Sequence, residues 1–172
     1  MTALGCSKVP SNRLAAEYDI LYETASRIGS LAAHSGWVVL TGGGPGVMAA
    51  ACRGAVSAAG LTVGIVPFER PTTAYPNQWV RLPIYTGAGM ARNAFNVLSA
   101  TLCVALGGGA GTLSEIALAL KAGVEIWCYR SWRLEPPAST RGAGQPRLFT
   151  DDDKLLSALQ KRFRAGASSP TP

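Results

Sequence analysis

The sequence predicts one α/β domain with a Rossmann-like, doubly wound parallel sheet. Short apolar runs alternate along the chain with helical stretches of the length that crosses over between parallel strands. Two of these runs end in glycine-rich turns that lead into helices. The length of 172 residues fits a single core, and 48% apolar with 15% charged residues suits a buried sheet better than a disordered chain.

The first half of the chain reads as a β-strand end followed by a helix and a βαβ unit. Apolar residues recur at helical spacing until Gly36, and Gly60 is a plausible stop for the alanine-rich helix before it. The run from Trp37 to Thr41 has the composition of a strand that is buried on both faces. In order, we expect a strand end at 1–4 running into the turn Gly5-Cys6-Ser7, a helix at 13–35, a strand at 37–41, a helix at 47–59 and a strand at 61–66.

The second half continues the alternation after a proline-rich stretch. Three prolines in 67–76 indicate a surface loop over the carboxyl end of the sheet. Thr150 to Asp153 offers an N-cap, with acids in the first turn of a terminal helix. We expect strands at 79–84, 101–106 and 124–129, helices at 90–99, 112–122 and 155–163, and a loop at 133–145. The domain is then 1–164, with a flexible tail at 165–172.

Composition disfavours several classes of function. The net charge is +6, but half of the excess lies in 141–172, and no basic run tracks a nucleic-acid backbone. The four cysteines lie far apart and the only histidine is His34, so no metal site is expected. No apolar run is long enough to span a bilayer. Cysteines within predicted strands suit reduced thiols, and we expect a cytoplasmic protein without membrane contact.

The two glycine turns are the strongest functional signal. Glycines let the backbone approach a ligand closely, and the helix that follows presents free amides to an anion. Neither turn has the Gly-Lys-Ser/Thr of a nucleotide P-loop or the spacing of a dinucleotide site. The alternative is a structural module whose turns only allow tight helix packing. The residues expected to line a phosphate-binding crevice are Gly43, Gly44 and Gly46 in the first turn and Gly108, Gly109, Gly111 and Thr112 in the second.

Arg92, Asn93 and Glu115 are the charged or polar candidates for the same crevice. Arg92 and Asn93 fall in the first turn of a predicted helix, and an arginine can clamp a phosphate or carboxylate with two N–H bonds. A solvated surface arginine is the alternative. Glu115 lies three residues after Thr112, so it either completes a capping box or faces the crevice.

These motifs resemble a known superfamily. The segments Thr41 to Met48, Gly89 to Asn93 and Gly108 to Glu115 look like those of the Lonely Guy cytokinin-activating proteins, and within that superfamily they are most similar to molybdenum cofactor carrier proteins. The likeness covers roughly residues 4–130. It implies a Rossmann-like fold, a homo-oligomer (dimer or tetramer), and a phosphate cradle at the second turn.

The carrier resemblance implies a protein that binds, stores and protects molybdenum cofactor, a phosphorylated molybdopterin, for delivery to apo-molybdoenzymes such as nitrate reductase. It implies no catalytic residue and no protein ligand to the metal. The phosphate would lie on Gly108, Gly109, Gly111 and Thr112, with the first turn as the opposite wall. Arg92, Asn93, Ser114 and Glu115 would lie near the pterin or metal end.

The alternative within the superfamily is a nucleoside 5′-monophosphate phosphoribohydrolase. Lonely Guy enzymes use P-G-G-x-G-T-x-E-E with an upstream Arg-Lys; here Gly107, Ser114 and Asn93 replace the proline, the first glutamate and the lysine. Arg92 and Glu115 remain as the catalytic candidates of such an enzyme. Because this chemistry needs an acid/base group and a carboxylate that stabilises developing positive charge, the loss of one acid favours a binder.

Overall fold

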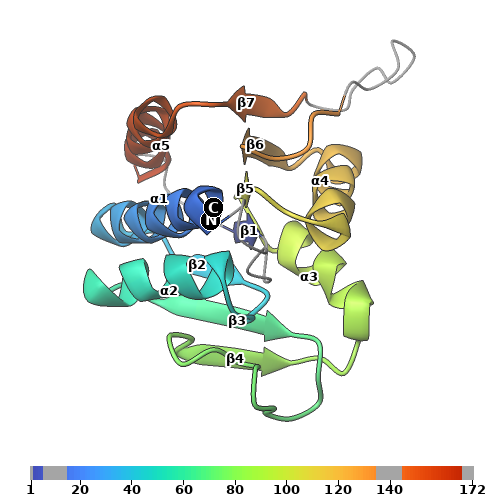
Figure 1. Ribbon diagram of the computed structural model, residues 1–172. Helices are drawn as coiled ribbons and strands as arrows, with labels where there is room; N and C mark the ends of the chain where they lie inside the picture. Colours follow the sequence, from blue (N-terminus) through green and yellow to red (C-terminus); the bar gives the residue numbers. More distant parts are fainter. Residues whose placement is uncertain (1, 6–14, 135–144, 168–172) are drawn as a thin grey trace.

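A computed structural model describes residues 2–5, 15–134 and 145–167, and within them all strands join one parallel sheet (Figure 1). The spatial order of its seven strands is β4-β3-β2-β1-β5-β6-β7. The strands are β1 (Thr2–Gly5), β2 (Val39–Thr41), β3 (Thr62–Val66), β4 (Leu82–Tyr85), β5 (Leu102–Leu106), β6 (Glu125–Tyr129) and β7 (Arg147–Phe149).

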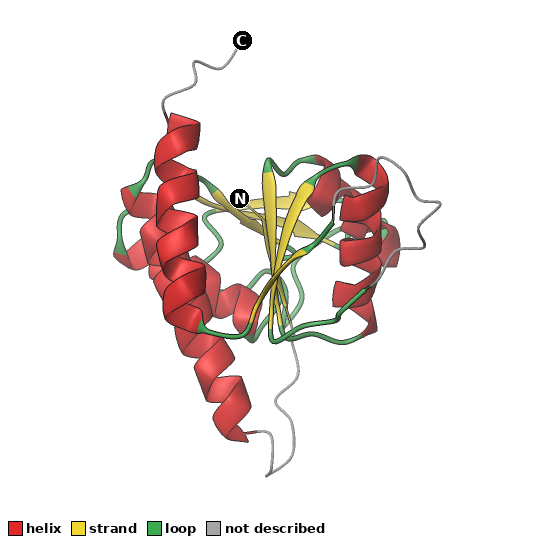
Figure 2. Ribbon diagram, turned by 90° about the horizontal axis from the view of Figure 1, so that it is seen from above, coloured by secondary structure: helices red, strands yellow, loops and turns green. Residues whose placement is uncertain are grey.

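Helices cover both faces of the sheet, as a doubly wound fold requires (Figure 2). One layer holds α1 (Ala15–His34), α2 (Val47–Ser57) and α5 (Asp152–Ala167). The opposite layer holds α3 (Arg92–Leu98), preceded by the short 3₁₀ turn η1 (Gly89–Ala91), and α4 (Ala110–Ala122). The predicted Rossmann-like α/β fold is confirmed.

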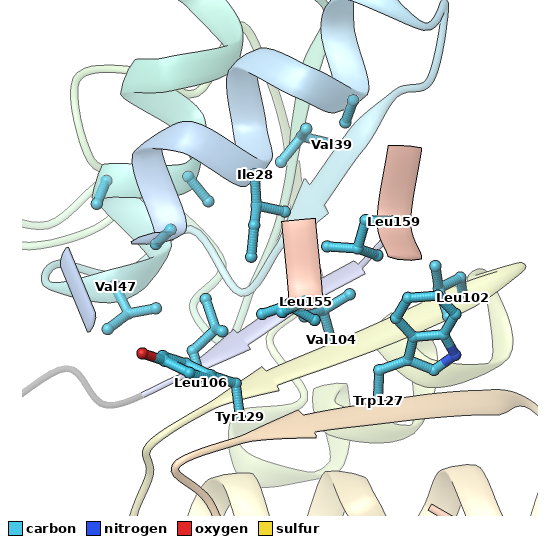
Figure 3. Close-up of a cluster of buried hydrophobic side chains, with 14 of the residues drawn as sticks. Ile28, Val39, Val47, Leu102, Val104, Leu106, Trp127, Tyr129, Leu155 and Leu159 are labelled. Carbon is cyan, nitrogen blue, oxygen red and sulfur yellow. The ribbon is translucent and has the colours of Figure 1, made fainter. Parts of the chain in front are cut away.

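Strand pleating divides the core between the two faces. Leu102, Val104 and Leu106 point toward α1, α2 and α5, where Trp127 and Tyr129 of β6 join them (Figure 3). The alternate residues of β5 and β6 are smaller, among them cysteine and alanine, and pack under α3 and α4. Both faces of the central strands are therefore buried, which is why their sequences are continuous apolar runs.

The strand order reverses at β1, and this places the functional candidates. β2 and β5 flank β1, so the turns that follow β2 and β5 lie at the same carboxyl edge of the sheet. In open α/β sheets, ligands bind in the crevice at such a reversal point. The expected turn at Gly5 to Ser7 falls mostly on residues 6–14, which lie outside the described residues.

Several element boundaries differ from the sequence-based expectation. The helix α2 ends at Ser57, and the left-handed residue after it is Ala59 (φ 57°), not Gly60. Gly60 is needed for packing instead, because a Cβ there would overlap the Ala33 side chain. The strand β7 was not predicted: it is three residues long, and it borders 135–144, which lie outside the described residues.

The terminal helix is capped as the acidic segment predicts. The Asp151 carboxylate Oδ1 accepts a hydrogen bond from the Lys154 amide at 2.9 Å, and α5 begins at Asp152. The helix runs to Ala167, and 168–172 lie outside the described residues. In the described part of the chain, no helix is both long and apolar enough to cross a bilayer.

Candidate functional site

The turn after β5 is held by two side chains from the loop that follows β6. Ser131 Oγ donates to the Gly107 carbonyl at 2.5 Å, and Trp132 Nε1 donates to the Gly109 carbonyl at 3.3 Å. In a planar trans peptide the N–H of the next residue points opposite to the carbonyl. The amides of Gly108 and Ala110 therefore point away from the loop that follows β6. Positive φ values at Gly107 (58°) and Gly108 (118°) make this turn possible.

The helix α4 begins at this turn without a side-chain cap. Gly109 is its N-cap residue, and the Leu113 amide makes the first helical hydrogen bond, to the Gly109 carbonyl at 3.0 Å. The amides of Ala110, Gly111 and Thr112 precede that bond, so the helix itself gives them no acceptor. Free amides combined with the partial positive charge of a helix N-terminus are the arrangement that favours an anion. We call the segment from Gly107 to Thr112 the α4 mouth.

Two glycines of the α4 mouth make no close contact with the described part of the chain. A Cβ built on Gly109 or Gly111 would meet no described atom within 4 Å, and neither residue has a positive φ. Glycine within a helix costs about 1 kcal/mol relative to alanine. This cost applies to Gly111, which lies inside α4 and is not explained by packing against the described residues, whereas glycine is a common N-cap residue at Gly109. Gly108 is different, since a Cβ there would overlap the Thr112 side chain.

The turn after β2 is held by an asparagine from the loop between β3 and β4. The Asn77 amide donates to the Gly43 carbonyl at 2.7 Å, and Asn77 Nδ2 donates to the Gly44 carbonyl at 2.8 Å. The Gly43 amide donates to Thr41 Oγ1 at 3.1 Å, so this amide of a residue predicted to line the crevice is already engaged inside the chain. The helix α2 starts after Gly46 (φ 69°), again without a side-chain cap.

Replacing Asn77 with alanine is expected to lower the free energy of unfolding by about 1–3 kcal/mol, because it leaves the buried Gly44 carbonyl without that donor. It also removes the acceptor of the Trp79 amide. Urea unfolding measures the change, with the exposed neighbour Gln78→Ala as the matched control. If the free energy of unfolding falls no more than in the control, Asn77 does not stabilise the turn after β2.

Arg92 connects the turn after β2 with the helix α4. Its guanidinium lies directly against Gly42, where any Cβ would overlap it, and its Nη1 lies 3.7 Å from Glu115 Oε1 on α4. Asn96, one turn further along α3, donates from Nδ2 to the same carboxylate oxygen at 3.2 Å. The Arg92 and Glu115 side chains are only 11% and 8% exposed. The surface-arginine alternative for Arg92 is therefore wrong.

Burial raises the pKa of Glu115 above its usual range, and the Asn96 hydrogen bond and the Arg92 charge only partly oppose this effect. The carboxyl is thus poised to hold a proton more readily than an exposed glutamate. Cys103 on β5 lies near it, and burial followed by the repulsion from Glu115 raises the pKa of that thiol to about 12.

The capping-box interpretation of Glu115 is also wrong. The helix α4 starts at Ala110, two residues before the predicted start, so Thr112 is inside the helix and Gly109 is the cap. The Glu115 carboxylate turns to α3 instead of to the helix start.

Asn93 and Ser114 hold each other and the α4 mouth. Asn93 Nδ2 donates to Ser114 Oγ at 2.9 Å, and Ser114 Oγ donates to the Gly111 carbonyl at 2.7 Å. The first of these bonds joins α3 to α4, and the second lies within the first turn of α4. Asn93 Nδ2 and Ser114 Oγ are thus engaged within the chain, and a direct contact of either atom with a ligand requires exchange of these bonds.

Sequence reasoning missed Asn77, Ser131 and Trp132. All three act through contacts with turn carbonyls that are more than 20 residues away in sequence. The proline-rich composition around Asn77 indicated a loop at the carboxyl edge, which was the only available signal.

Comparisons with known proteins agree with this architecture. The model of the SLOG cluster4 family matches residues 11–154. An uncharacterised protein of Archaeoglobus fulgidus is 40% identical over 136 residues, which make up 79% of this chain and 83% of that protein.

Two solved structures are similar over nearly their whole length. The molybdenum cofactor binding protein from the phototrophic bacterium Rippkaea orientalis is 32% identical, with a TM-score of 0.73 over 94% of each chain. The Moco carrier protein from Chlamydomonas reinhardtii is 33% identical, with a TM-score of 0.74 over 96% of each chain. The kinship with molybdenum cofactor carriers suggested by the motifs is confirmed, and this chain belongs to the SLOG cluster4 family.

Proposed function

We propose that this protein binds molybdenum cofactor by its terminal phosphate, stores and protects it in the cytoplasm, and delivers it to apo-molybdoenzymes such as nitrate reductase. The observation that carries the proposal is the α4 mouth, a helix N-terminus without a side-chain cap beside two glycines that face open space. The similarity to cofactor-binding and carrier proteins supports the identity of the ligand.

The residues present suit the chemistry of such a ligand. A phosphate accepts hydrogen bonds from the amides of the α4 mouth, which requires no lysine. The buried Arg92 guanidinium supplies a fixed positive charge for the anionic part of the ligand. The Glu115 carboxyl and the Asn96 amide beside it are polar groups of the kind that hydrogen-bond a pterin ring. Ligation of the metal by the protein is not part of this proposal.

Loading the protein with the cofactor under anaerobic conditions tests the proposal. After gel filtration, we expect about one pterin and one molybdenum per chain, slower loss of the cofactor in air than for the free compound, and reconstitution of apo-nitrate reductase. Isothermal titration should show weaker binding of the dephosphorylated pterin, because it lacks the group that the α4 mouth holds. Equal affinity for the two forms would contradict binding through the phosphate.

A second candidate function is N-glycosidic hydrolysis of a nucleoside monophosphate. It is favoured by the buried Arg92–Glu115 pair and by the raised pKa of Glu115, which is the property of a general acid. Incubation with AMP and with prenylated AMP should then release the free base. The variant Glu115→Gln separates the two functions: lost turnover with retained binding indicates catalysis, whereas a change in affinity alone indicates carriage.

We also propose that the protein forms a homo-oligomer through η1 and α3. Met90 and Leu98 are 91% and 67% exposed, and Phe95 between them is 48% exposed. Apolar side chains that cluster on one surface usually mark an interface.

The double variant Met90→Glu/Leu98→Glu is expected to shift the protein toward monomer, because it places charges in that interface. Light scattering coupled to gel filtration measures the mass. The matched control is Leu61→Glu, which alters an exposed leucine at the start of β3. A wild-type protein that is monomeric at micromolar concentration would sink the proposed interface.

A further inference from the structure

A groove separate from the glycine turns runs between α5 and β7. Its volume is about 950 Å³, and its walls come from β6, β7 and the side of α5 that carries Lys154, Ser157 and Lys161. Figure 1 shows β7 at the end of the sheet farthest from β4, with α5 beside it. The groove is not used by the proposed function.

The two acidic side chains of the groove, Glu125 and Asp153, each have a cationic partner in the chain. Glu125 Oε2 accepts a hydrogen bond from Arg162 at 2.8 Å, and its Oε1 accepts one from Trp127 Nε1 at 2.8 Å. Asp153 pairs with Arg27 at 3.1 Å. The groove is lined by four cationic and two acidic side chains, so its net charge is positive.

Three cations of the groove have no such partner. Within the described residues, no carboxylate lies within 4.0 Å of the charged groups of Arg147, Lys154 or Lys161. The Arg147 guanidinium is held over the Trp127 ring at 4.7 Å and over the Phe149 ring at 5.2 Å. Lys154 and Lys161 are two helical turns apart on one side of α5, separated by roughly 10 Å. Lys154 and Lys161 thus form a positively charged row on α5, and Arg147 lies on β7 in the same groove.

The opposite wall is an open sheet edge. In the described part of the chain, β7 pairs only with β6, so the backbone N–H and C=O of Leu148, which point to its other side, have no strand partner. The Leu148 side chain is 48% exposed beside this edge. Extended peptides bind to such edges by adding a strand, and their side chains give specificity.

We propose that this groove binds an extended, acidic peptide segment of a partner protein. The peptide backbone pairs with the outer edge of β7, and its carboxylates contact Arg147, Lys154 and Lys161. A single-stranded nucleic acid is disfavoured because such sites need exposed aromatic rings for base stacking. Here Trp127 is only 2% exposed and lies under Arg147.

Fluorescence polarisation of the full chain with a short labelled peptide of alternating valine and glutamate tests the proposal. We expect binding about tenfold tighter than that of the matched valine-lysine peptide or of oligo-dT, and weaker binding as salt rises. The variant Lys154→Glu/Lys161→Glu should lose about tenfold in affinity. The control Arg81→Glu/Lys121→Glu makes the same charge change on exposed residues outside the groove. This control should bind the valine-glutamate peptide as tightly as the wild type does.

Two further measurements make the outcome decisive. The groove variant should bind molybdopterin like the wild type, which shows that the fold is intact. N-methylation of the peptide backbone should abolish binding, because it removes the donors that pair with β7. The proposal is overturned if oligo-dT binds more tightly, if charge reversal has no effect, if the methylated peptide binds equally well, or if concentration-dependent self-association through this edge is found instead.

Discussion

Replacing Gly111 with aspartate is expected to weaken the binding of a phosphorylated ligand by about 30-fold or more while leaving the fold intact. The new side chain enters open space, because no described atom lies within 4 Å of a Cβ at this position. Its carboxylate then competes with the phosphate for the amides of the α4 mouth and repels it. The same carboxylate stabilises the helix N-terminus by about 0.3–1 kcal/mol, so stability should rise as affinity falls.

Opposite effects on stability and binding distinguish a ligand site from a packing turn. Titration calorimetry and urea unfolding measure the two quantities on the same samples. The matched control is Ala117→Asp, which adds the same charge to an exposed position further along α4. The milder variant Gly111→Ala should stabilise the fold by about 0.5–1 kcal/mol and still weaken binding. Unchanged affinity in Gly111→Asp would exclude the α4 mouth as the phosphate site.

Replacing Arg92 with leucine is expected to lower both affinity and stability. Ligand affinity should fall at least about tenfold, because a charge-assisted contact is lost. The free energy of unfolding should fall by about 3 kcal/mol near pH 8, because the substitution leaves the Glu115 carboxylate buried without its cation. Unfolding followed by fluorescence across a pH series measures the second effect.

The stability loss of Arg92→Leu should depend on pH in a defined direction. Burial already raises the pKa of Glu115, and removal of Arg92 raises it further. A carboxyl whose folded pKa lies above its unfolded value, about 4.3, is protonated more in the folded state, so stability falls as pH rises through the folded pKa. The difference in free energy of unfolding between the wild type and Arg92→Leu should therefore be small near pH 4 and largest above neutrality.

A second substitution provides the control for this pair. In Arg92→Leu/Glu115→Gln no charge remains to be buried, so most of the stability lost near pH 8 should return and the pH dependence should disappear. A deficit that is the same at all pH values, or that persists in the double variant, would show that Arg92 acts through packing against Gly42 alone.

Local patterns were sufficient to predict the layered fold. The buried strands β3, β5 and β6 are continuous apolar runs, and the long helix α1 shows clear helical spacing. The strand β7 escaped prediction because three residues at a sheet edge carry no periodic signal. The end of α2 was misplaced because an alanine adopts the left-handed conformation that glycine normally takes.

The sequence predicted only part of the candidate site. Glycine turns after apolar strands identified the carboxyl edge, and the fold brought Arg92 and Glu115 together there. The sequence does not show which side chains contact Glu115, so a capping box fitted it equally well. The structure shows that its carboxylate contacts Asn96 and Arg92 of α3. The contacts of Asn77 and Ser131 with turn carbonyls depend on tertiary structure, and no local motif encodes them.

The position of the ligand phosphate can be read directly from backbone amide signals. In a nuclear magnetic resonance titration of ¹⁵N-labelled protein with molybdopterin, the amides of Ala110, Gly111 and Thr112 should show the largest shifts, and the dephosphorylated pterin should leave them nearly unchanged. If the signals of those three amides do not shift while the phosphorylated ligand binds, the phosphate is bound elsewhere. The claim that the α4 mouth holds the phosphate is then wrong.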